Sequence, residues 1–270
     1  MNKKLINWWA GGSSGGSSDA DAEAFFTAAG ITDATQKLAV TNLAIGMKAN
    51  SLWTKMYAIY PLVGGTATTH KWNLKDPRDL DAAYRITWVG TQTHASTGVL
   101  SNGTTGYGRT FFTPSTNGFS SSNGAIGYYS RTNDNSSAQY DMGACSAASA
   151  NNVIVISRYN TGNAIFGVGT STFACSVAVA DSLGFYVSSR VSATNTSGYK
   201  NGSLIKNIAD GGTQPAVPLF LLCLNNNTTP AFFSKKECAF AFISDTLSDS
   251  EVTTLNTLVQ AFQTTLGRNV

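Results

Sequence analysis

After Pro61 the chain consists of short apolar runs, each separated from the next by clusters of Gly, Asn, Ser and Thr. Runs of this length and composition are typical of the strands of an antiparallel sandwich. Strands do not alternate with helices, which argues against a parallel α/β sheet. Asn-Gly pairs lie between the runs, and such pairs supply the two left-handed residues of a tight hairpin turn. The clearest runs span residues 84–89, 125–129, 153–156 and 183–187, and the Asn-Gly pairs begin at Asn102, Asn117, Asn123 and Asn201.

Residues 19–60 show a helical pattern instead. Asp19 is a candidate N-cap for a first helix, and Gly30 ends it. Asp33 precedes a second segment with the 3.6-residue period of an amphipathic helix. A third short helix is predicted from Ser51 to Tyr60, because Pro61 follows. We therefore expect a helical neck of about 40 residues, too small to be stable alone, which packs on the main domain, on its own copies or on a partner.

The chain begins with the sequence MNKKLINWWAGGSSGGSS. Its apolar stretch is too short and too interrupted for a secretion signal or a membrane-spanning helix. Residues 11–18 have the composition of a flexible Gly/Ser linker. Residues 1–10 are interpreted as a docking peptide, with a cloning remnant and a cap folded onto its own domain as alternatives. The docking residues would be Lys3, Lys4, Leu5, Ile6, Trp8 and Trp9.

Charge and cysteine content restrict the function classes. Charged residues make up 12% of the chain, the net charge is +3, and the basic residues are scattered. A nucleic-acid-binding protein would cluster them on one face. We therefore expect no nucleic-acid partner and no membrane insertion. No cysteine pair has the C-x-x-C spacing of a zinc or redox site, so we expect buried thiols, with one disulfide as an alternative. These cysteines are Cys145, Cys175, Cys223 and Cys238.

The last third of the chain carries a more specific pattern. Tyr199-Lys200-Asn201-Gly202 precedes an apolar run at 204–205, and further apolar runs follow at 217–224 and 238–243. The sequence then reads Leu-Ser-Asp-Ser-Glu at 247–251, a capping box before an apolar helical stripe. Over residues 181–267 this order resembles the closing half of the concanavalin A-like lectin/glucanase jelly roll, as in laminin-G-like and pentraxin-like domains. The resemblance implies a mainly β, antiparallel two-sheet sandwich over residues 61–270, with a C-terminal helix.

Two further stretches, 64–81 and 259–268, resemble a family of tailed-phage and bacterial proteins with the same helical lead and jelly roll. This resemblance implies a virion protein, assembled in the host cytoplasm, that serves as a fibre, a capsid decoration or a tail component. Its partners would be other virion proteins, copies of itself (a trimer is one option) and a host surface glycan. A purely structural decoration without a ligand is the alternative.

Glucanases of the jelly-roll fold place Glu, Asp and Glu on alternate residues of one strand. The glutamates here are Glu23 in the helical lead, Glu251 in the capping box, and Glu237, which has no acidic neighbour two residues away. Outside the Gly/Ser run of residues 11–18, no G-x-S-x-G motif occurs either. We therefore expect no catalytic residue, no cofactor and no enzymatic activity, with a glycan-degrading enzyme as the weaker alternative.

An acidic cluster follows the helical lead. Asp76, Asp79 and Asp81 lack the D-x-D-x-D-G pattern of a dedicated calcium loop. We expect them to pair with Arg78 and Arg85 in a turn, and we predict no metal site.

Sugar binding needs an exposed aromatic ring beside polar groups, because a sugar has apolar C–H faces and polar edges. Adjacent residues of a strand point to opposite faces, so at most one of Tyr128 and Tyr129 could face a ligand. The candidate glycan-binding residues are Tyr128, Tyr129, Arg131, Asn133, Tyr140 and Asp141.

Overall fold

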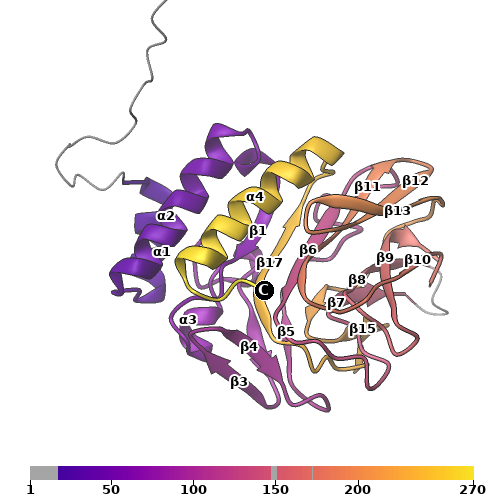
Figure 1. The fold of residues 1–270 in the computed structure, drawn as a ribbon, viewed down its shortest axis with the longest axis horizontal. Coiled ribbons are helices and arrows are strands. Elements are labelled where there is room, and N and C mark those ends of the chain that lie inside the picture. The colour runs from indigo at the N-terminus through magenta and orange to yellow at the C-terminus, as the bar shows by residue number, and fades with distance from the viewer. Residues whose placement is uncertain (1–17, 147–150, 172) are drawn as a thin grey trace, which may run out of the picture.

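The protein is described here from a computed structural model, which places residues 18–146, 151–171 and 173–270. Two sheets pack face to face as a sandwich (Figure 1), and all their pairings are antiparallel except that of β15 with β7. The predicted mainly β, two-sheet architecture is confirmed.

Sheet A has eight strands in the order β13-β12-β11-β6-β17-β4-β3, with β1 also paired to β17. Its strands are β1 (Met56–Tyr60), β3 (Gln92–Ala95), β4 (Gly98–Ser101), β6 (Ala125–Ser130), β11 (Gly184–Ser192), β12 (Asn195–Lys200), β13 (Ser203–Ala209) and β17 (Cys238–Ser244). Sheet B has nine strands in the order β10-β9-β8-β7-β14-β5-β2, with β15 and β16 off this path. Its strands are β2 (Thr87–Val89), β5 (Tyr107–Arg109), β7 (Met142–Cys145), β8 (Asn152–Ile156), β9 (Asn163–Thr170), β10 (Cys175–Ala178), β14 (Phe220–Leu221), β15 (Leu224–Asn226) and β16 (Thr229–Ala231).

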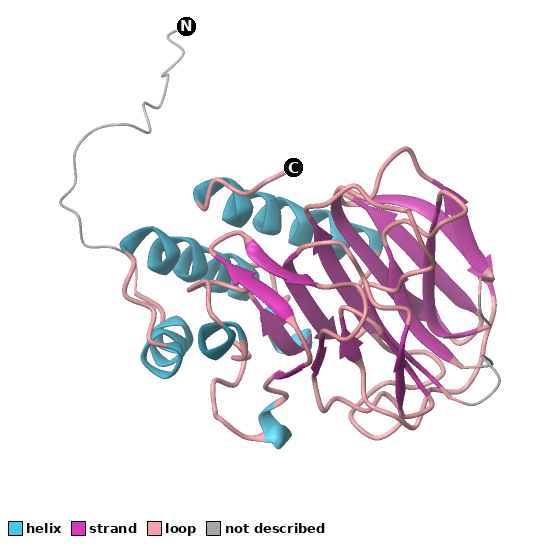
Figure 2. Cartoon of the chain, turned by 90° about the horizontal axis from the view of Figure 1, so that it is seen from below, coloured by secondary structure: helices cyan, strands magenta, loops and turns pink. Residues whose placement is uncertain are grey.

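Three helices cover the outer face of sheet A (Figure 2): α1 (Ala20–Ala29), α2 (Ala34–Ala49) and α4 (Asp249–Thr265). Their buried side chains form one apolar cluster with sheet residues such as Phe185 and Phe240. The expected caps are present: Asp19 accepts from the first turn of α1, and Ser248 forms a reciprocal capping box with Glu251. Short helices α3 (Ala67–His70), η1 (Trp53–Lys55) and η2 (Asp81–Ala83) complete the set. No helix of the described residues is long and apolar enough to cross a membrane.

The helix predicted over residues 51–60 is wrong. After the single turn of η1 the chain becomes strand β1, in which Ile59 pairs with Phe242 and Tyr60 with Ala241 of β17. A continuous apolar run has no decisive period, and its partner strand lies about 180 residues further on. Sheet A therefore begins before Pro61, and the helices pack onto it rather than standing apart as a neck.

The predicted hairpin at Asn201-Gly202 is confirmed. These residues have φ values of 49° and 79°, the left-handed pair of a type I′ turn, and they join β12 to β13. The four cysteines are free thiols, all of them buried, as expected.

The C-terminal tail is fixed by a buried arginine. The guanidinium of Arg268 donates to the backbone carbonyls of Pro61, Leu62 and Ala239, and its Nε donates to Gln263. These bonds tie the end of the chain to the start and end of sheet A. They also give the buried guanidinium its hydrogen-bond acceptors. Burial of this charge without such partners would be strongly destabilising.

Candidate functional site

The two outer faces of the sandwich differ in their cover. Helices cover the outer face of sheet A, whereas the outer face of sheet B has no helix packed on it among the described residues (Figures 1 and 2). A pocket of about 240 Å³ opens on sheet B. Its lining residues are Arg109, Phe111, Pro218, Phe220, Asn225 and Thr228.

The strand register places the pocket on the outer face. Arg109 of β5 pairs with Phe220 of β14, so their side chains project from the same side of the sheet. The next residue, Leu221, points the other way into the core between the sheets. Phe220 itself packs with Tyr107 outside that core, at a ring-centroid distance of 4.8 Å.

Arg109 is the cation of the pocket. Its Nε and Nη2 atoms donate to the hydroxyl of Tyr107 at 3.3 and 3.1 Å. Its guanidinium carbon lies 5.8 Å from the ring centroids of both Tyr107 and Phe220, within the range of a cation–π contact. Arg109 forms no ion pair with any residue that the structure describes. The pocket thus holds an oriented guanidinium whose charge no carboxylate neutralises.

Asn225 also lines the pocket and is 1% exposed. Its Nδ2 donates to the carbonyl of Pro218 at 2.8 Å, which sets the orientation of the amide. Its Oδ1 is buried and has no hydrogen-bond donor among the described residues. A buried acceptor without a partner is destabilising, so this oxygen is a site at which a ligand donor would be favoured.

Two lining residues have unusual backbone conformations. Phe111 has a φ of 60° and Thr228 a φ of 77°, both in the left-handed region that side-chain-bearing residues rarely adopt. Thr228 lies in the turn between β15 and β16. Such conformations persist only where the surrounding structure imposes them, and they cluster at ligand sites.

Further along this face lies a set of aromatic rings that we call the aromatic row: Phe232, Tyr140, Tyr159 and Phe173. Tyr140 contacts Phe232 and Tyr159 at centroid distances of 5.3 and 6.1 Å, and Tyr159 contacts Phe173 at 5.1 Å. The end rings, Phe232 and Phe173, are 42% and 41% exposed. Phe233 contacts Tyr107 at 6.2 Å, so the adjacent residues 232 and 233 link the row to the pocket.

The tyrosine platform proposed from the sequence is not supported by the structure. Tyr128 and Tyr129 do point to opposite faces of β6, but both are 0% exposed. Tyr128 packs in the core between the sheets, and Tyr129 packs under the helices that cover sheet A. The prediction that the two tyrosines point to opposite faces was correct, but a sequence pattern does not reveal that both faces of β6 are covered by other parts of the molecule.

The other predicted sugar-binding residues do not form one site. Tyr140 is 4% exposed and Asp141 is fully buried, so neither presents its polar group to a surface ligand. Arg131 is paired with Glu237 at 2.6 Å. Asn133 is exposed, but its side chain accepts from the backbone N–H of Ser182 at 3.2 Å.

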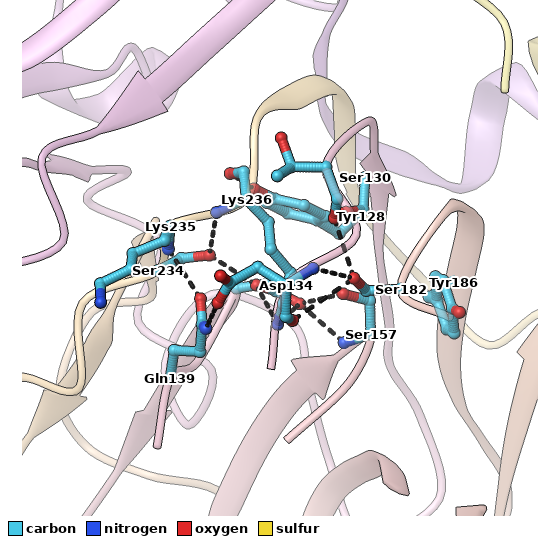
Figure 3. Close-up of polar contacts among 12 residues, drawn as sticks. Tyr128, Ser130, Asp134, Gln139, Ser157, Ser182, Tyr186, Ser234, Lys235 and Lys236 are labelled. Carbon is cyan, nitrogen blue, oxygen red and sulfur yellow. Dashed lines mark hydrogen bonds and ion pairs between the residues drawn. The ribbon is translucent and has the colours of Figure 1, made fainter. Parts of the chain in front are cut away.

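Asp141 belongs instead to a buried polar cluster (Figure 3). Its two oxygens receive Lys236 Nζ at 3.1 and 3.2 Å, and they also accept from Ser157 and Ser234. Burial lowers the pKa of the Lys236 ammonium, and the nearby carboxylate opposes that shift. Because Asp141 and Lys236 are fully enclosed, we assign the cluster to holding β7, β8 and the segment before β17 together.

The acidic cluster near residue 80 forms ion pairs, as expected. Arg78 binds Asp76 at 2.5 Å, and Arg85 binds Asp81 at 2.7 Å and Asp79 at 3.3 Å. These aspartates are therefore engaged in a turn. The predicted docking residues Lys3, Lys4, Leu5, Ile6, Trp8 and Trp9 lie outside the described part of the chain.

No protein-family model and no curated protein sequence matches the chain. Among solved structures, a sialidase mutant from Trypanosoma rangeli with trans-sialidase activity aligns over 84% of this chain and 40% of its own, with 9% identity and a TM-score of 0.52. Domain 4 of a GH43 extracellular arabinanase from Geobacillus stearothermophilus, in complex with arabinotriose, covers 75% of this chain and 98% of that domain at 15% identity and a TM-score of 0.47. The NanB sialidase from Streptococcus pneumoniae covers 49% and 24%, with 14% identity and a TM-score of 0.40. At 9% identity, the similarity to the Trypanosoma rangeli sialidase shows a shared fold alone.

The expectation that the chain is not an enzyme, which was deduced from its sequence, is wrong. The solved structure that shares its fold at a TM-score of 0.52 is a sialidase mutant with trans-sialidase activity, so this fold also occurs in an enzyme. The missing Glu-x-Asp-x-Glu strand excludes one glucanase arrangement only, since other glycosidases use different residues.

The pocket residues Arg109, Phe220 and Asn225 were not found from the sequence. They come from three strands, and more than 100 residues separate β5 from the other two. No local motif joins them. Residues 218–224 form a continuous apolar run, so the sequence does not show which of their side chains face outward.

Proposed function

We propose that this protein binds glycans in the pocket on the outer face of sheet B. The observation that carries the proposal is the unpartnered, buried Oδ1 of Asn225 beside the rings of Phe111 and Phe220 and the guanidinium of Arg109. Sugar-binding pockets combine apolar rings with a few oriented polar groups in this way.

Each group in the pocket suits one part of a sugar. The rings of Phe111 and Phe220 and the apolar ring of Pro218 can pack against a C–H face. Arg109 can donate to ring or hydroxyl oxygens, and Asn225 Oδ1 can accept from a hydroxyl.

The structural similarities support the same class of ligand. The sialidase with which the chain shares its fold acts on a glycan, and the arabinanase domain was solved with arabinotriose. The resemblance of the closing strands to lectin and glucanase jelly rolls agrees with this.

A glycan array probed with the full chain tests the proposal, and the same incubations analysed for released sugars test cleavage. We expect Thr228→Trp, which fills the mouth of the pocket, to weaken binding by about 10-fold or more, the scale of losing one or two good contacts. The matched control is Asn207→Leu on the exposed side of β13 in sheet A, which should bind as the wild type does. Absence of binding to every glycan, or full binding by Thr228→Trp, would contradict the proposal.

We also propose that residues 1–10 anchor the protein to a virion, so that the sandwich is displayed to a host surface. This part rests on the sequence resemblance and on the composition of the N-terminal peptide and linker. A chain lacking residues 1–12 should fold and bind glycan yet fail to assemble onto particles, and normal assembly would contradict it.

A further inference from the structure

We infer that the pocket is specific for an acidic saccharide, whose carboxylate binds Arg109 and whose hydroxyl binds Asn225. This inference rests on the proposed glycan binding and names the chemical class of its ligand. Three features of the site lead to it: the free edge of the guanidinium, the absence of a neutralising acid, and the single unpartnered acceptor.

Arg109 has a free edge of the right geometry. Its Nε and Nη2 already donate to the hydroxyl of Tyr107. A guanidinium has five N–H donors, so Nη1 and the second N–H of Nη2 have no partner among the described residues. These terminal donors lie side by side, which is the geometry that a carboxylate accepts through both oxygens.

The guanidinium is held in place before a ligand binds. The rings of Tyr107 and Phe220 lie on it at 5.8 Å, and the Tyr107 hydroxyl fixes one side of it. A flexible arginine loses side-chain entropy on binding, and this arrangement has already removed much of that cost. Two parallel hydrogen bonds from a guanidinium of fixed orientation favour a planar carboxylate, which has two acceptor oxygens, over a hydroxyl group, which has one.

No acid neutralises this cation. None of the residues that line the pocket is acidic, and Arg109 has no carboxylate partner in the described chain. The neighbouring Arg85, which lies against Phe111, differs in this respect because it is paired with Asp79 and Asp81. The pocket therefore carries one uncompensated positive charge.

The rest of the pocket argues for a sugar acid rather than a phosphate. A phosphate presents only acceptor oxygens and needs several donors, whereas Asn225, which lines this pocket, has a buried Oδ1 acceptor without a donor among the described residues. A sugar acid satisfies both groups, since its carboxylate accepts from Arg109 and a ring hydroxyl donates to Asn225. The rings of Phe111 and Phe220 suit its C–H face.

The test compares acidic and neutral forms of the same saccharides with the full chain. The probes are oligogalacturonide and its methyl ester, and sialyllactose and its methyl ester. We expect the acidic member of at least one pair to bind about 10- to 100-fold more tightly, and the preference to shrink as salt is added. Arg109→Gln should abolish the preference, and Arg109→Lys should restore it only in part because it keeps the charge without the fork.

The matched control is Lys37→Gln, which removes one positive charge from α2 on the opposite, helix-covered side and should leave the preference unchanged. Thermal unfolding of each variant verifies that the exposed substitutions leave the fold intact. Equal binding of acidic and neutral members, lost with Thr228→Trp, would overturn the acidic specificity and leave the glycan-binding proposal standing. Binding of no saccharide would overturn both.

Discussion

At the scale of single residues, burial decides the chemistry of His70 and His94. Their Nδ1 atoms lie 3.0 Å apart, and the backbone N–H of Gly65 donates to His70 Nε2 at 3.1 Å. That bond assigns the His70 proton to Nδ1, where it is donated to His94. Burial lowers the pKa of His70 to about 3, assisted by the charges of His94 and Arg268.

This shift predicts sensitivity to acid. The ordinary pKa of histidine is 6.5, so between pH 6.5 and 3 the unfolded chain takes up a proton that folded His70 does not. Stability conferred by neutral His70 is therefore present above pH 6.5 and is lost as the pH falls. Urea unfolding at pH 7 and pH 4 should show a loss of up to about 3 kcal/mol attributable to this residue, at 1.36 kcal/mol per pH unit.

The control separates His70 from the carboxylates that also titrate in this range. His70→Gln can still accept from Gly65 and donate to His94, but it does not titrate. It should be less stable than the wild type at pH 7 and lose less stability on acidification. Equal losses for the two proteins would show that His70 does not contribute.

At the scale of elements, the outer face of sheet B joins a pocket to an aromatic row whose two end rings, Phe232 and Phe173, are exposed. The pocket lies beside β5 and β14, and the row follows β16 and extends past β7 and β8 toward β10. Rings at this exposure are available to stack on sugars, because an aromatic face packs against C–H groups. A saccharide longer than the pocket would therefore extend along the row.

This arrangement predicts that chain length matters for binding. Phe232→Ala should lower affinity for a long saccharide by about 5- to 10-fold, comparable to the loss of one aromatic contact, and barely change affinity for a monosaccharide. Titration calorimetry of both ligands measures the difference. The control is Leu204→Ala, which removes an exposed apolar side chain from β13 in sheet A. Equal loss for short and long saccharides would show that the row is not a binding surface.

At the scale of the whole molecule, the helices are part of the sandwich. Residues of α1, α2 and α4 share one core with Tyr129 and Phe185 of sheet A. Strand β1 adds a further pairing to β17. The predicted division at residue 61 therefore cuts through a sheet and its cover.

Truncation tests this view. A chain of residues 61–270 loses β1, α1 and α2 and exposes apolar side chains of sheet A and α4. We expect it to aggregate or to bind a hydrophobic dye without a cooperative unfolding transition. A chain of residues 18–270 is the control and should unfold cooperatively. Equal unfolding midpoints for the two would contradict a shared core.

The sequence by itself determined the features that depend on neighbours along the chain. The cap of α4 at Ser248 and Glu251 and the turn at Asn201-Gly202 are local, because each is made by residues at most three positions apart. Strands with a clear apolar run, such as β6, β8, β11 and β17, also followed from local composition, whereas β1 did not. Its apolar run was assigned to a helix because only its partner β17 distinguishes the two.

Only the tertiary structure decided what each face of a strand meets. Alternation places Tyr128 and Tyr129 on opposite sides of β6, but the second sheet covers one and the helices cover the other. The candidate site arises in the same way, since sheet pairing brings Arg109 beside Phe220 and Asn225 lines the same pocket. A binding site assembled from several strands depends on which strands pair and on what packs against each face of the sheet. No local sequence pattern encodes either of these.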